Sequence, residues 1–221
     1  MLPRLLWDNI IMDLLATPLE EASNEVRVLA AALELLASRG EAALRVTTVA
    51  EIAGVSVGTI YTHFDSRDGL IEAAFLEQYR RQLGEHLRPF DRVIGPNCSR
   101  EDLLKSLRES ADLDSASEQV AARRIRCEIM GASHYRPKLA EGISRQNYEI
   151  AQIELAATKH AQELGLIDQS IDPEALVALI QIVLFGLVLR DSDVEDNPLP
   201  ANFLDSIVQF AGAFFPLPLP S

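Results

Sequence analysis

The segment that most restricts what this 221-residue chain can fold into is 46–64, where two short apolar patterns flank a glycine. Val49 and Ile60 fall at inward positions on either side of Gly54, at a spacing that predicts two short helices packed together. Gly54 stands where the chain must turn sharply, and glycine adopts the positive φ of such a turn at little cost. Ser56 is the expected N-cap of the second helix. The segment therefore predicts a helix-turn-helix.

The exposed residues of this motif are small and polar, which suits contacts to DNA. The second helix of such a pair can enter the major groove while the first crosses the backbone. Hydroxyl groups and free N-terminal amides donate to phosphate oxygens. Asp65 is the expected cap of the following helix, and Arg67 adds a positive charge near its start. The residues expected to contact DNA are Thr47, Thr48, Ser56, Val57, Gly58, Thr59, Tyr61, Thr62, His63 and Arg67.

Helical periodicity continues through the rest of the chain, and no segment alternates convincingly like a strand. The fold class is therefore predicted to be all-α, with an N-terminal three-helix DNA-binding domain and a helical C-terminal domain. The expected helices are 25–39 with Ser23 or Asn24 as its cap, 46–53, 57–63, 66–86, one opening at a Ser99–Asp102 capping box, 116–131, 137–164, one starting at Pro173 after the cap Asp172, and 201–215.

Turn-forming residues divide the chain into parts. The loop 91–98, with Gly95 and Pro96, is the best candidate for a boundary between two domains. The predicted organisation is an N-terminal extension at 1–24, a DNA-binding domain at 25–75, an effector-binding and dimerisation domain at 76–215, and a proline-rich tail at 216–221.

The charge of the chain bears on how it could hold DNA. The formal net charge is −13, which argues against a protein that binds nucleic acid by bulk electrostatics. The segment 25–90 carries seven arginines against nine acidic residues, so it is the least acidic part per residue without being basic. Binding would therefore depend on a few placed contacts, and non-specific binding should be weak.

The sequence also disfavours several other classes of protein. Cys98 and Cys127 are far apart and predict two free thiols rather than a disulfide framework. The longest apolar run, 175–189, is shorter than the ~18–20 residues that a bilayer span needs. No metal cluster, phosphate loop or nucleophile–base pair stands out, so neither an enzyme nor a cofactor is expected.

Four short motifs in this region form an ordered set: Ala53-Gly54-Val55-Ser56, Gly58-Thr59-Ile60-Tyr61, His63-Phe64 and Ser66-Arg67-Asp68-Gly69-Leu70. Together they resemble the signature of TetR-family transcriptional regulators, and the similarity spans about residues 26–75. Two positions depart from the family pattern: Val57 stands where relatives often carry a polar or basic residue, and Arg67 where lysine is commoner.

The resemblance implies specific roles for the chain. It implies a homodimer joined by a four-helix bundle, an effector pocket in the C-terminal domain, and repression that is relieved when the effector binds. Tyr61 and Arg67 would contact phosphates. The residues at or near the bases would be Thr48, Val57, Gly58, Thr59 and His63.

The last two long helices are apolar enough to form an interface. The segment 172–190 is apolar all round, which predicts burial on every side, and 201–215 presents a phenylalanine-bearing face. Together they carry more apolar surface than a small domain easily hides, so a homodimer is expected. The predicted interface residues are Leu176, Ile180, Leu184, Leu187, Phe203, Ile207, Phe210 and Phe214.

The hypothesis is a cytoplasmic, ligand-responsive regulator, released from a pseudo-palindromic double-stranded operator when a small-molecule effector shifts the helix at 66–86. Its expected partners are the operator, a second copy of the chain and the effector, with no membrane. One alternative is a helical interaction protein whose helix-turn-helix no longer binds DNA, motivated by the acidic charge and Val57. A helical enzyme ranks last. The residues that line the effector pocket are not predicted.

Overall fold

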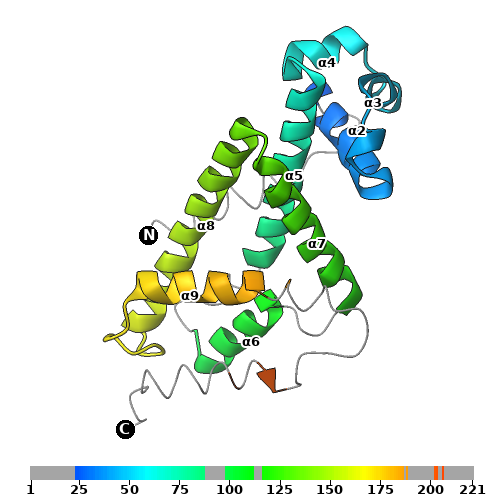
Figure 1. The fold of residues 1–221 in the computed structure, drawn as a ribbon. Coiled ribbons are helices and arrows are strands. Elements are labelled where there is room, and N and C mark those ends of the chain that lie inside the picture. Colours follow the sequence, from blue (N-terminus) through cyan, green and yellow to red (C-terminus); the bar gives the residue numbers. More distant parts are fainter. Residues whose placement is uncertain are drawn as a thin grey trace. The chain divides into compact units, whose positions relative to one another are not determined.

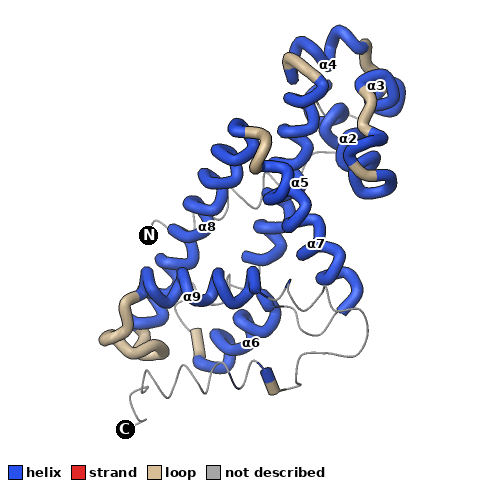
Figure 2. Tube along the Cα trace, viewed as in Figure 1, coloured by secondary structure: helices blue, strands red, loops and turns tan. Residues whose placement is uncertain are grey.

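The computed structural model describes residues 23–87, 98–111 and 116–186, together with residues 188, 202, 203 and 206. Within these residues every regular element is a helix (Figures 1 and 2), which confirms the predicted all-α class. The predictions for 1–22, for the loop 91–97 and for the tail 216–221 concern residues outside this part of the chain. The same holds for most of the predicted final helix at 201–215.

The helix boundaries agree with the sequence patterns to within one or two residues for the helices before the loop 91–98. The structure adds one short 3-10 helix, η1, which the periodicity does not predict. The described elements are α2 (Asn24–Arg39), η1 (Glu41–Ala43), α3 (Val46–Ala53), α4 (Val57–Phe64), α5 (Arg67–Leu87), α6 (Arg100–Ala111), α7 (Ala116–Ser133), α8 (Pro137–Glu163) and α9 (Pro173–Gly186).

The chain divides into two compact units. The N-terminal unit consists of Leu2–Gly84 and Ile129–Gln146, and the C-terminal unit contains Glu85–Glu128 and Asn147–Ser221. Helices α5, α7 and α8 therefore contribute residues to both units. The N-terminal unit contains more than the predicted DNA-binding domain, because the corner between α7 and α8 belongs to it. The predicted domain boundary after residue 75 remains a prediction.

The core of the N-terminal unit forms where α2, α3 and α4 gather at the start of α5 (Figure 1). Val28 of α2, Val49 of α3 and Ile60 of α4 are fully buried, together with Leu70 and Ile71 of α5. Burial of such side chains is the main force that holds short helices in place, because helices of eight residues are not stable alone. This core fixes the angle between α3 and α4.

The corner between α7 and α8 also packs within the N-terminal unit. Leu139 and Ile143 of α8 are buried. A Cβ atom added at Gly142 would overlap with the side chain of Leu76 on α5, so glycine permits close approach of the two helices. The Gln146 side-chain amide donates to the Leu76 carbonyl at 3.3 Å. The first turns of α8 are thus held against α5.

The C-terminal unit contains α6, the part of α8 from Asn147 onward, and α9. The predicted caps are present: Ser99 and Asp102 exchange hydrogen bonds at the start of α6, and the Glu174 amide donates to Asp172 at 2.9 Å. Gln181 of α9 donates to the buried Glu154 carboxylate of α8 at 2.6 Å.

Cys98 and Cys127 are both free thiols, as predicted. Among the described helices, none has the length and apolar character needed to cross a bilayer.

Candidate nucleic-acid interface

The turn between α3 and α4 has the geometry that the sequence predicts. Gly54 has φ +64° and ψ +38°, the left-handed conformation that closes a helix end. The Val55 amide donates back to the Ala50 carbonyl at 3.0 Å. Arg27 of α2 donates to the carbonyls of Ala53 and Gly54, at 2.5 and 3.3 Å. This arginine places a positive charge at the negative end of α3 and fixes the turn to α2.

The start of α4 is organised by hydroxyl groups. The Ser56 Oγ accepts from the Thr59 amide at 3.0 Å and lies 2.8 Å from the Thr59 hydroxyl. The Thr62 hydroxyl donates to the Gly58 carbonyl at 2.9 Å. These bonds confirm Ser56 as the N-cap and orient three hydroxyls along the helix. Each retains lone-pair or donor capacity for an outside partner.

The side chains predicted to meet DNA are accessible to solvent. Tyr61 is 47% exposed, and only Thr48 and Thr59 of the set are half-buried. The exposed members are Thr47, Ser56, Val57, Gly58, Tyr61, Thr62, His63 and Arg67. The structure thus brings nine of the ten to the motif formed by α3 and α4, and Arg67 to the start of α5.

Gly58 is the most informative of these residues. A Cβ atom added there would find its nearest neighbour, the Ser56 Oγ, at 3.6 Å, which is ordinary van der Waals contact. The chain's own packing therefore gives no reason for glycine at this helical position, where alanine would stabilise the helix. The absence of a side chain matters for whatever approaches α4 from outside.

Arg67 has a structural role that the sequence pattern does not reveal. Its Nε donates to the Leu44 carbonyl at 2.9 Å, and its Nη2 donates to the Glu41 carbonyl at 3.3 Å. The guanidinium therefore holds the loop that leads into α3. The predicted phosphate contact of Arg67 remains a prediction, and a substitution there would disturb the loop as well as any DNA contact.

The cap of α5 differs from the prediction. Ser66, not Asp65, accepts from the Gly69 amide, at 2.9 Å. Asp65 instead closes α4 with φ +60°, and it is the only non-glycine residue with positive φ in the described part of the chain. The reason is the tight joint between α4 and α5: a Cβ atom at Gly69 would overlap with the Phe64 carbonyl oxygen. Asp65 is therefore used for the turn and Ser66 for the cap.

The exposed apolar face of α9 lies at positions that the sequence analysis did not select. Leu176, Ile180 and Phe203 are half-buried within the chain. The large exposed side chains of α9 are Leu179, Ile182 and Phe185, at 46%, 69% and 40% exposure. The expectation that this helix is buried on every side is therefore wrong for a single chain. The side chains of Leu184, Leu187, Ile207, Phe210 and Phe214 lie outside the described residues.

Comparisons with known proteins agree with the geometry of α3 and α4. Residues 28–74 match the family described as "Bacterial regulatory proteins, tetR family". The transcriptional regulator UidR of Escherichia coli is 24% identical over 193 residues, which cover 87% of this chain and 93% of UidR.

Solved structures give the same result for the fold. GusR of Salmonella enterica has a TM-score of 0.63 and 25% identity, covering 91% of this chain and 98% of GusR. A TetR-family regulator from Rhodococcus has a TM-score of 0.59 and 26% identity, covering 84% and 97%. A regulator from Saccharomonospora viridis, solved in complex with choline, shares the fold at 17% identity and a TM-score of 0.60, covering 86% and 96%.

Proposed function

Because the chain belongs to the TetR family of transcriptional regulators, we propose that it is a homodimeric repressor that a small molecule releases from its operator. The family is not an enzymatic one. The observation that carries the proposal is the outward side of α4, where small polar groups surround a glycine that the fold itself does not need.

In this proposal α4 lies in the major groove. The hydroxyls of Thr47 and Tyr61 donate to phosphates or base edges, the Thr62 hydroxyl, whose proton is donated to the Gly58 carbonyl, accepts from a base edge, and Val57 contacts the methyl group of a thymine. Gly58 lets the helix backbone approach the groove closely. The negative net charge restricts affinity to sites where these contacts fit, because few cations are present to hold arbitrary DNA.

Dimerisation would determine the distance between the two copies of α4 and therefore the spacing of the DNA half-sites. Leu179, Ile182 and Phe185 form an apolar stripe on α9 at helical spacing, and a two-fold axis places such a stripe against itself. Two copies of α4 would then read half-sites about 34–36 Å apart on one face of the duplex. A pseudo-palindromic operator follows from this symmetry.

The effector is proposed to be a small molecule bound by the C-terminal helices. A neighbour of the same fold binds choline, which supports a small organic ligand in general and leaves its class for this chain open. Binding would change the separation of the two α4 helices and so lower operator affinity. The repressor would act in the cytoplasm, where the DNA is.

The test is a selection of random duplex DNA by the purified protein, compared with two glycine variants. Gly58→Ala should leave the fold intact and remove most of the enrichment, because a methyl group enters the interface. Gly131→Ala is the matched control, since Gly131 lies on α7 and a Cβ there meets nothing within 4 Å, so neither substitution causes an overlap within the chain. A two-fold symmetric motif for the wild type and for Gly131→Ala, lost in Gly58→Ala, is the expected result. No enrichment by the wild type would instead favour the interaction protein.

A further inference from the structure

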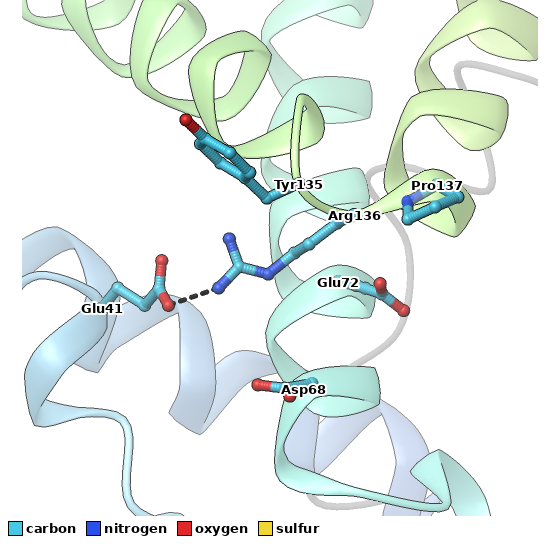
Figure 3. Close-up of a pocket in the computed structure, with 6 residues that line it drawn as sticks. All are labelled: Glu41, Asp68, Glu72, Tyr135, Arg136 and Pro137. Carbon is cyan, nitrogen blue, oxygen red and sulfur yellow. Dashed lines mark hydrogen bonds and ion pairs between the residues drawn. The ribbon is translucent and has the colours of Figure 1, made fainter.

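The corner between α7 and α8 makes a long-range contact inside the N-terminal unit. Arg136, the last residue before α8, forms an ion pair with Glu41 of η1, with its Nη2 2.5 Å from the Glu41 Oε1 (Figure 3). The two side chains are 20% and 32% exposed. A pair in this partly buried setting is less screened by salt than a surface pair.

The surroundings of Arg136 favour a defined position for its guanidinium. Its central carbon lies 6.0 Å from the centroid of the Phe75 ring, within cation–π range. The group lies at a pocket of about 530 Å³ that is also lined by Asp68 and Glu72 of α5. Figure 3 shows the Glu41 carboxylate bonded to the guanidinium and the Glu72 carboxylate pointing away from it, while Asp68 lies 3.9 Å from Arg67.

Glu41 is connected to the helix-turn-helix by its backbone as well. Its carbonyl accepts from Arg67, and the same arginine holds the Leu44 carbonyl. Residues 40–45 lead directly into α3, and the far end of α3 is held by Arg27. A displacement of Glu41 would therefore be transmitted to the first residues of α3.

We propose that Arg136 is a positioning residue: through Glu41 it holds the loop before α3 in the arrangement that binds DNA. The inference rests on the proposed function. The physical basis of the inference is that α7 and α8 are continuous helices that run from this corner into the C-terminal unit. A change in those helices reaches the helix-turn-helix through the ion pair, in addition to any movement of α5.

Asp68 and Glu72, in the first two turns of α5, line the same pocket as Arg136. In this proposal they supply negative charge near Arg136 when it leaves Glu41. The cost of breaking the pair is thereby reduced, which suits a contact that must open during regulation.

The experiment measures two quantities for Glu41→Gln, Arg136→Gln, their double variant and the charge swap Glu41→Arg with Arg136→Glu. The first is the affinity for the duplex selected from random DNA. Each single variant should bind about 10-fold more weakly, and the double variant no more weakly than either. The charge swap should regain at least part of the loss. Arg145→Gln is the matched control, because it breaks an exposed ion pair with Glu141 on α8.

The second quantity is hydrogen exchange of the α3 amides in the absence of DNA. Exchange in α3 should be faster in Arg136→Gln and unchanged in Arg145→Gln. Unchanged α3 exchange in Arg136→Gln would overturn the inference, and so would faster exchange with undiminished DNA affinity. If the wild type selects no duplex, the proposed function fails, while the exchange data still decide whether Arg136 holds α3.

Discussion

Helices α4 and α9 both expose one side, and the chemistry of the two sides is opposite. On α4 the exposed residues are Gly58, Tyr61, Thr62 and His63, with Val57 as the one aliphatic side chain, whereas the large exposed side chains of α9 are Leu179, Ile182 and Phe185. Water solvates the first set well and the second poorly. The difference fits the proposed partners, which are polar, highly charged DNA for α4 and an equally apolar surface for α9.

The largest expected effect is on the apolar side. In the proposed dimer, Ile182→Asp should raise the dissociation constant by about 100-fold or more, because a carboxylate would be buried twice across the two-fold axis. Sedimentation equilibrium measures the change, and Glu174→Gln, an exposed substitution on the same helix, is the control. A dimer that survives Ile182→Asp unaltered would place the interface elsewhere.

Salt should act on the two surfaces in opposite directions. Raising NaCl from about 50 to about 200 mM should weaken operator binding by about 10-fold, as expected for two phosphate contacts made by cations. The dimer should hold equally well or better, since salt does not weaken apolar burial. Fluorescence anisotropy follows the first quantity and sedimentation the second. A dimer that weakens with salt as steeply as operator binding would contradict the comparison.

The smallest expected effect is on stability, and it concerns an ion-pair cluster on α5, a helix with residues in both units. Burial raises the pKa of the Glu77 carboxyl, but hydrogen bonds and charges from Arg80 and Arg81 outweigh it and hold the pKa below its ordinary value. This carboxylate therefore stabilises the fold above the unfolded pKa of about 4.3, and the contribution disappears as the pH falls through the lower folded pKa.

Glu77→Gln should accordingly cost about 1 kcal/mol at neutral pH, a few degrees of Tm, and little in acid. Thermal unfolding at a series of pH values measures the difference from the wild type. Glu141→Gln, which removes an exposed i,i+4 partner, should have almost no effect at any pH. An equal cost of Glu77→Gln at every pH would mean that the charge of Glu77 is irrelevant to stability.

What the sequence predicts well is local. Ser23, Gly54 and Ser56 mark helix ends by chemistry that acts within four residues, so the bounds of α2, α3 and α4 follow from the pattern. The prediction of Asp65 as the cap of α5 is wrong, because the close contact at Gly69 makes Asp65 the turn residue and leaves the cap to Ser66.

What the sequence cannot show is the partner of a long side chain. Arg27, Arg67 and Arg136 bond to groups more than twenty residues away, and nothing in their spacing identifies those groups. The exposed face of α9 was missed for another reason. Because α9 is apolar on all sides, its sequence pattern does not distinguish an exposed face from a buried one. Only the packing of the helix decides which residues are exposed.

The accessible side of α4 has a consequence for how proteins of this design can diverge. Because the side chains of Val57, Tyr61 and Thr62 point away from the core that Ile60 and Phe64 complete, they can be exchanged at little cost in folding. If α4 reads DNA as proposed, recognition of new sequences can be explored one residue at a time on an unchanged scaffold, whether by drift after gene duplication or in a laboratory library.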